Sequence, residues 1–278
     1  MIHRLHIWAA GLVIAAGLAS PAHAAWRLAS TDAPIVVVRG ANVMLAAAGD
    51  ILRDGDLLES RDGVAHLQDE HGTLAALGPQ TRAMLTAAAH VALLSGSLKI
   101  ASAACESARC EPVRVDTEAG TIEVGPGAAA IVAAPENTQT LDVFSETGTQ
   151  TFAAKPPTPI PAGRFAIIDN RGHVQPFARP TEAFVARMPV AFRDALQPLV
   201  AANPARVAPP SRAAAYDDIA PWLNSKLPER KAFPARFRSR LADRGFREEI
   251  QVHLNTLPDW RALLYPPERA GVHKVRYP

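Results

Sequence analysis

The sequence predicts an α+β fold, in which an all-β domain with a roll or jelly-roll-like architecture precedes a small helical domain. Residues 49–98 support the β part, because apolar residues recur at every second position and Gly, Asp and Pro interrupt them at short intervals. The net charge divides the chain, at −6 over residues 25–186 and +7 over residues 187–278. We expect a β-domain at 25–170, a connecting segment at 171–186 and the helical domain at 187–278.

The first 24 residues have the pattern of a signal peptide. Arg4 provides the positive charge, Ile7–Ala19 an apolar stretch of 13 residues, and Ala22–Ala24 a small-x-small cleavage site. The expected mature chain starts at Ala25, where no cysteine offers a lipid-attachment site. A retained membrane anchor is the alternative, but the apolar stretch is short for a bilayer span. The predicted location is therefore periplasmic, without a membrane-spanning segment after cleavage.

Several stretches have the alternation or the composition of strands. In VRVDT, residues 113–117, the two valines and the threonine share one face while the charged residues share the other. Unbroken apolar runs at 36–38 and 128–134 indicate strands that are covered on both faces. Residues 81–94 remain open, because their alanines and valine also fit helical spacing.

Four stretches of the second half have the length and composition of helices. They are Phe192–Ala202, Tyr216–Leu227, Glu229–Arg244 and Phe246–Leu254. In the third stretch, helical geometry aligns Phe233, Phe237 and Leu241 along one apolar row. Aromatic residues of this half are expected to fill its core.

A row of arginines runs beside the apolar row of the third predicted helix. Arg236, Arg240 and Arg244 lie about 60° around the helix, so their stems are expected to pack on its edge while the guanidinium groups stay in water. With Arg247, they form a candidate basic interaction surface.

Three interpretations of this basic surface remain open. It is a solvated helix face, it docks onto the acidic β-domain of the same chain, or it captures an anionic envelope polymer or lipid headgroup. Nucleic acid is not expected as a partner, because the chain is exported and its overall charge is only +2.

Two cysteines, Cys105 and Cys110, enclose four residues between two strand-like stretches. In an oxidising compartment this spacing favours a disulfide that pins a hairpin loop, which contributes on the order of 2 kcal/mol. Metal binding is the alternative, but two thiols without a neighbouring histidine provide too few ligands.

The motifs that suggest catalysis or metal binding fit turns and strand edges better. HLQDEH at 66–71 departs from metalloprotease spacing and precedes Gly72, which favours a hairpin turn. Apolar residues interrupt the acidic residues between 50 and 62 in the pattern of strands, whereas a calcium loop needs closely spaced oxygen ligands around a glycine. These acids are expected to be turn and edge charges that discourage strand pairing. No nucleophile elbow, phosphate loop or dinucleotide fingerprint is present. We therefore expect no catalytic residue, no cofactor and no metal.

The order of elements in the β region resembles the periplasmic FecR domain. The resemblance covers roughly residues 45–169 and rests on Gly49-Asp50, Gly55-Asp56, Gly63–Leu67, Gly72-Thr73, Leu77–Pro79, Thr81, Leu94–Leu98, Val113–Thr117, Leu141–Phe144 and Pro161–Gly163. It implies a compact β-roll or jelly-roll-like domain, no cofactor, and contacts with other envelope components.

The chain departs from the FecR pattern in two respects. Gly125-Pro126-Gly127 stands where the family has a Gly-Thr step, and its proline suggests an edge or a bulge. The sequence also shows no counterpart of the cytoplasmic segment and transmembrane helix of the family's regulators, so we do not expect it to relay a signal across the inner membrane by itself.

These expectations together describe a non-enzymatic, exported interaction module of envelope sensing or assembly. Its expected contact surface is the exposed β edge plus the basic helices, and its expected partner is an envelope protein or an anionic cell-wall polymer. The alternative is a binder of cell-wall polysaccharide or peptidoglycan.

Overall fold

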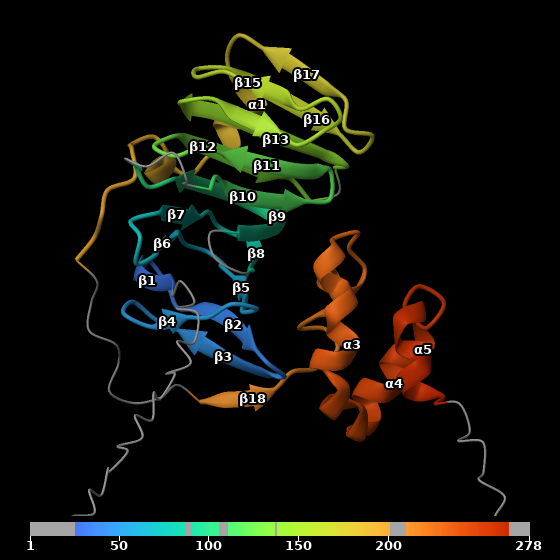
Figure 1. Cartoon of the computed structure of the whole chain (residues 1–278). Helices are drawn as coiled ribbons and strands as arrows, with labels where there is room; N and C mark the ends of the chain where they lie inside the picture. The colour runs from blue at the N-terminus through green and yellow to red at the C-terminus, as the bar shows by residue number, and fades with distance from the viewer. Residues whose placement is uncertain (1–25, 87–89, 106–110, 137, 201–209, 267–278) are drawn as a thin grey trace, which may run out of the picture.

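The computed structural model describes residues 26–86, 90–105, 111–136, 138–200 and 210–266, and it is mainly antiparallel β (Figure 1). The described residues form 18 strands in one connected sheet, and the pair β9–β10 alone is parallel. This confirms the predicted β character of the first half. A sandwich or a jelly-roll order of strands is not confirmed.

The sheet consists of two half-sheets that share the long strand β9 (His90–Ala101). Half-sheet A runs in the order β4 (Ile51–Leu52), β1 (Trp26–Thr31), β6 (Ala65–Gln68), β7 (Leu74–Leu77), β9, β12 (Ala129–Ala134), β13 (Thr140–Thr147), β16 (Phe165–Asp169) and β17 (Val174–Phe177). Half-sheet B runs in the order β18 (Ser211–Ala213), β3 (Asn42–Ala46), β2 (Ile35–Arg39), β5 (Leu57–Glu59), β8 (Arg82–Leu85), β9, β10 (Val113–Thr117), β11 (Gly120–Val124), β14 (Gln150–Phe152) and β15 (Thr158–Ile160).

Strand β9 passes from one half-sheet to the other at Gly96. Its residues up to Ser95 pair with β8 and β10, and those from Gly96 onward pair with β7 and β12. Gly96 has a φ of +94°, and a Cβ there would lie 2.5 Å from the Cα of Thr81. The Thr81 hydroxyl donates to the Ser97 carbonyl (3.1 Å) and accepts from the Ser97 amide (3.0 Å), which replaces ladder bonds at the bend.

Two predictions about individual strands can be checked here. The valines of β2 alternate between two cores, since Val37 joins the core between the half-sheets and Val36 and Val38 join a cluster on the outer face of half-sheet B. Coverage on both faces is thus confirmed. The helical alternative for residues 81–94 is wrong, because its described residues include β8 and the first half of β9.

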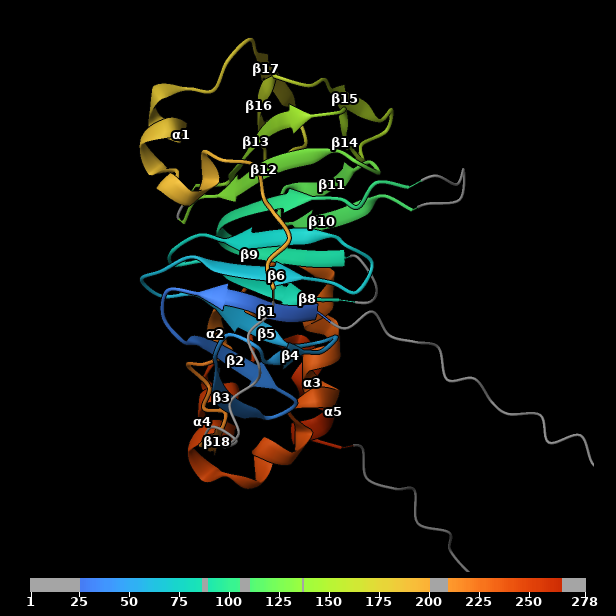
Figure 2. The same cartoon turned by 90° about the vertical axis from the view of Figure 1, so that its left-hand side faces the viewer.

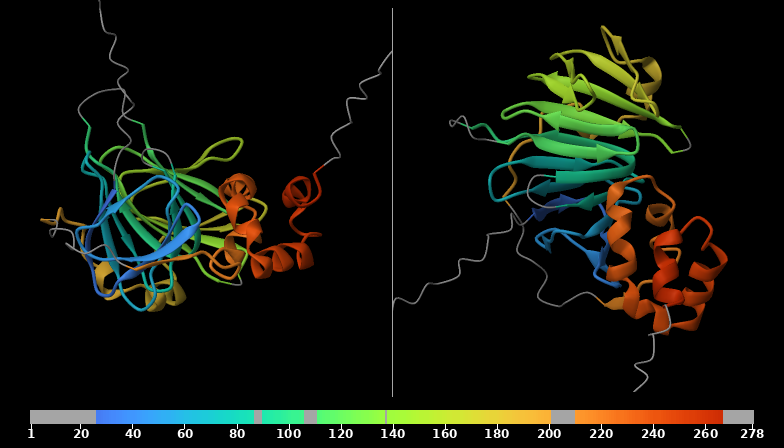
Figure 3. Two further views of the ribbon diagram at one scale, coloured as in Figure 1. Left: turned by 90° about the horizontal axis from the view of Figure 1, so that it is seen from below. Right: turned by 45° about the vertical axis from the view of Figure 1, so that its right-hand side comes forward.

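Three apolar clusters hold the fold together. The inner core lies between the half-sheets, so the sheet curls around it (Figure 3). The outer-A cluster lies under α1 (Glu182–Arg187) and the 3-10 turn η1 (Val190–Phe192), where Phe184 packs on Phe165 with ring centroids 4.8 Å apart (Figure 2). The outer-B cluster lies under the C-terminal segment, which we define as residues 211–264.

The C-terminal segment consists of short elements rather than long helices. They are β18, α2 (Ala220–Leu223), η2 (Pro228–Ala232), α3 (Phe233–Arg236), η3 (Arg238–Ala242), α4 (Arg244–Val252), η4 (Pro258–Trp260) and α5 (Arg261–Leu264). The predicted helices at 216–227 and 229–244 are too long, because Pro221 and Pro234 each stand in the first turn of a new, short helix inside them. The helix predicted at 246–254 corresponds to α4, which also has nine residues. In the described part of 192–202, only Phe192 lies in a helical turn, and Pro198 disfavours a helix there.

Candidate functional site

The C-terminal segment packs on the outer face of half-sheet B, beside the first strands of the chain (Figure 3). β18 pairs with β3, and the amide of Ala214 donates to the Ala41 carbonyl over 2.9 Å. The outer-B cluster mixes Val36, Val38, Val43, Leu57, Met84 and Ala92 of the sheet with Tyr216, Trp222, Phe233, Phe237, Phe246, Ile250 and Trp260 of the segment. Of the three interpretations of the basic half, docking is the one that the structure contains.

Docking does not depend on opposite charges. Among the described residues, no side-chain ion pair joins residues 211–264 to the sheet, although the two halves of the sequence differ in net charge. The contact instead consists of buried apolar side chains, of backbone hydrogen bonds such as the β18–β3 pairing, of a bond from the Lys226 amide to Glu118, and of three hydrogen bonds from one arginine. Apolar burial is the dominant driving force for such packing.

Arg236, at the end of α3, is the arginine that donates hydrogen bonds to the sheet. Its guanidinium donates to the carbonyls of Val38 (2.7 Å) in β2, Gly40 (2.9 Å) in the β2–β3 turn and Gly55 (2.6 Å) in the turn before β5. Burial lowers the pKa of Arg236, and the nearby Asp56 carboxylate partly opposes this. The prediction that this guanidinium stays in water is therefore wrong.

The other predicted arginines divide into two kinds. Arg240 donates to the Ala214 carbonyl (2.8 Å) and lies over the Phe246 ring (5.6 Å), and Arg247 donates to the Leu241 carbonyl (2.7 Å). Arg244 has a side chain that is 91% exposed and pairs with Glu248 on its own helix (2.7 Å). Leu241 lies in a short 3-10 helix, which leaves carbonyls without helical partners, and Ala214 lies in the loop after β18, so each arginine satisfies a carbonyl outside regular helix pairing. The predicted row is therefore largely structural.

A buried cation also holds the chain on the opposite face of the fold. Lys99 of β9 is 1% exposed and donates to Glu146 (2.7 Å) and to the carbonyls of Phe192 and Asp194 (2.9 Å each). These bonds hold the η1 region against half-sheet A. Sequence reasoning missed Lys99, since a lysine in a strand is usually exposed.

The acidic and histidine-containing motifs form turns, as predicted. Asp56 is buried, pairs with Arg39 (2.6 Å) and accepts from the amide of Arg53 (2.8 Å). Asp69 accepts from the amides of His71 and Thr73, which closes the turn after β6. The described residues hold no group of three or more His, Cys, Asp or Glu that is arranged for a metal.

Three further findings concern predicted features. Cys110 and the residues of the signal peptide lie outside the described residues, so the disulfide of Cys105 with Cys110 and the leader stay predictions. The outer strands β15 and β17 contain Pro159 and Pro176, which reduce the donors that these edges offer to another strand. Within the described ranges, no helix has the length and apolarity to cross a membrane.

A basic groove lies within the C-terminal segment. It has a volume of about 510 Å³, and its lining is mostly apolar, formed by Lys231, Pro234, Ala235, Arg238, Asp259, Ala262 and Leu263. Lys231 and Arg238 are exposed. None of the four predicted arginines lines this groove.

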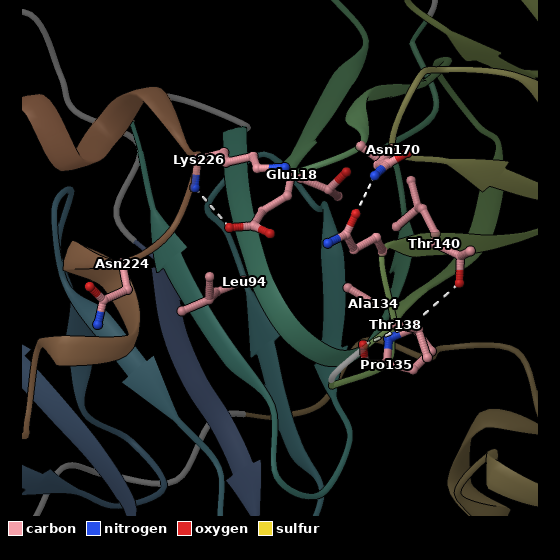
Figure 4. A pocket seen from close by; sticks show the side chains of 13 residues that line it. Leu94, Glu118, Ala134, Pro135, Thr138, Thr140, Asn170, Asn224 and Lys226 are labelled. Carbon is pink, nitrogen blue, oxygen red and sulfur yellow. Dashed lines mark hydrogen bonds between the residues drawn. The ribbon is translucent and has the colours of Figure 1, made fainter. Parts of the chain in front are cut away.

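A second cavity, the seam pocket, lies where the C-terminal segment meets the turns of the β-sheet (Figure 4). It has a volume of about 130 Å³, and it is lined by Leu94, Thr117, Glu118, Ala119, Ala134, Pro135, Thr138, Gln139, Thr140, Leu141, Asn170, Asn224 and Lys226. The amide of Lys226 donates to Glu118 Oε1 (2.8 Å), and Asn170 Nδ2 donates to Gln139 Oε1. These two bonds connect segments that are far apart in the sequence.

Comparisons with known proteins identify no family. No protein-family model and no curated protein matches the chain. Two crystal structures of a proposed anti-sigma factor from Parabacteroides distasonis are similar to it, at 16% and 14% identity and TM-scores of 0.37 and 0.29. The matches cover 44% and 50% of this chain and 58% and 59% of those chains, so this chain spans less than two thirds of either. Similarity at this level supports no functional assignment.

Proposed function

We propose that the protein is an exported, non-enzymatic FecR-like module that binds a protein partner in the cell envelope. The signal-peptide pattern supports export, and the order of turn motifs between residues 45 and 169 supports the FecR resemblance. The observation that carries the proposal is the basic groove, which an otherwise well-packed segment keeps open to solvent.

The chemistry of the groove indicates what kind of partner segment fits. Its apolar lining offers hydrophobic contact, and Lys231 and Arg238 offer two cations against the single carboxylate of Asp259. An acidic partner segment with one or two apolar side chains complements this surface. Docking on half-sheet B preorganises the groove, which reduces the entropy cost of binding.

Site-specific photo-crosslinking in intact cells tests this proposal. A crosslinker at Ala235 or Ala262, both exposed in the groove, is expected to trap one envelope protein, whereas a crosslinker at Gln251 on the exposed side of α4 is the matched control. Lys231→Glu with Arg238→Glu is expected to abolish the crosslink.

The matched charge control is Arg193→Glu with Arg244→Glu, which changes the net charge equally at two exposed positions outside the groove. It is expected to preserve the crosslink. Equal yields from groove and control positions, or equal losses in both charge variants, would contradict a partner site in the groove.

A further inference from the structure

We propose that the seam pocket binds one N-acetylhexosamine unit of a glycan. This inference goes beyond the proposed function and does not rest on it, because the pocket and the basic groove share no lining residue.

The shape of the pocket is built into the fold. Its walls come from Leu94 of β9, from the β10–β11 turn, from residues 134–135 and 138–141, from the β16–β17 turn and from the chain after α2. The bond from Lys226 to Glu118 joins the C-terminal segment to one turn, and the bond from Asn170 to Gln139 joins two others (Figure 4). A pocket whose walls are tied to one another is preorganised for a ligand.

The lining has an apolar part and a polar part. Leu94, Ala119, Ala134, Pro135 and Leu141 are apolar, and three carboxamides (Gln139, Asn170, Asn224), the hydroxyls of Thr138 and Thr140, and the Glu118 carboxylate are polar. A carboxamide places a donor beside an acceptor, which matches neighbouring hydroxyls or an acetamido group on a sugar ring. The apolar part suits the acetamido methyl and the C–H face of the ring.

The charge and size of the pocket limit the ligand. Lys226 and Glu118 are the charged lining residues and balance each other, so the pocket has no excess of cations for a phosphate or a polyanion. Its volume of about 130 Å³ lies below the roughly 300–1,000 Å³ of pockets that enclose drug-sized ligands. It therefore seats no more than one sugar unit, which it encloses in part, with the rest of the glycan outside.

Titration calorimetry of the purified protein with tri-N-acetylchitotriose tests this inference, with maltotriose and a peptidoglycan stem peptide as comparison ligands. Saturable binding of the chitotriose, at least tenfold tighter than that of either comparison ligand, is expected. Gln139→Leu with Asn224→Leu is expected to weaken it at least tenfold, because both carboxamides are lost while the side chains keep a similar size.

Two further variants test whether a loss of binding reflects the seam pocket itself rather than misfolding or the basic groove. Ala119→Phe fills the pocket without removing a polar group and is expected to abolish binding, whereas Lys231→Glu with Arg238→Glu is expected to leave it unchanged. Thermal melting of each variant establishes that it is folded. The inference is overturned if the wild-type protein shows no saturable chitotriose binding, or if binding survives in both folded pocket variants. A preference for maltotriose or for the stem peptide overturns it as well.

Sedimentation with purified sacculi identifies the source of the sugar. Pelleting that chitotriose competes away assigns the ligand to the cell-wall glycan. Chitotriose binding without pelleting supports the same pocket chemistry and assigns it to a soluble glycan.

Discussion

Replacing Arg236 by methionine tests whether one partly buried guanidinium fastens the C-terminal segment to the sheet. The change keeps a long apolar stem but removes the donors to Val38, Gly40 and Gly55. It also removes the cation from the Phe237 ring, whose centroid lies 5.0 Å from the guanidinium carbon.

The expected loss of stability follows from these contacts. Taking about 1 kcal/mol for each partly buried carbonyl that loses its donor, and about 0.5 kcal/mol for the ring contact, the free energy of unfolding falls by about 3 to 4 kcal/mol. Arg244→Met is the matched control from the same predicted row. Because Arg244 is exposed and pairs only with Glu248, its replacement is expected to cost at most about 0.5 kcal/mol.

Urea denaturation followed by tryptophan fluorescence measures both changes. Trp222 and Trp260 are buried in the outer-B cluster and report on the segment, and Trp26 is buried in the inner core and reports on the sheet. The midpoint for Arg236→Met is expected to fall well below that for Arg244→Met. If the two variants have the same midpoint, the structural role assigned to Arg236 is wrong.

Three further predictions concern Lys99, Gly96 and Glu229. Lys99→Met leaves Glu146 and two carbonyls without their donor, so it is expected to lower the free energy of unfolding by about 3 to 5 kcal/mol in urea denaturation. Adding Glu146→Leu should restore part of that loss. A double variant that is less stable than Lys99→Met alone contradicts this reasoning. Gly96→Ala is expected to cost at least about 1 kcal/mol because of its positive φ and the approach to Thr81, and an unchanged melting temperature argues against a strained bend. Burial raises the pKa of Glu229, so the stability that this group contributes is present below its unfolded pKa and is lost as pH rises through its folded pKa. Glu229→Gln should therefore flatten the decline of the unfolding free energy between these two pKa values. Identical pH profiles of the unfolding free energy for the variant and the wild type would exclude this linkage.

Local patterns predicted the strands well because sheet packing imposes a period of two. The VRVDT stretch alternates between buried and less buried residues, with Arg114 facing solvent, and the unbroken valines of β2 are buried on both faces of the sheet. The apolar row of Phe233 and Phe237 predicts too long a helix, because Pro234 lies between these residues and interrupts helical hydrogen bonding to the preceding turn.

The contacts that define the candidate sites leave no local signal in the sequence. Arg236 donates to carbonyls that lie 181 to 198 residues away, and backbone acceptors carry no residue identity. Lys99 likewise bonds to carbonyls more than 90 residues further on. The seam pocket collects side chains from five separate regions of the chain. Only the three-dimensional fold brings such groups together.

Amide hydrogen exchange of the full chain tests most directly whether the C-terminal segment is an integral part of the fold. The amides of Leu223 and Phe237, which bond to Ile219 and Phe233, are expected to be protected to a degree similar to that of Val37 in β2. Protection should persist at about 0.5 M salt, where exposed charges are largely screened, because docking is apolar. Rapid exchange throughout residues 211–264 beside a protected sheet, or protection that salt removes, would contradict the docked arrangement.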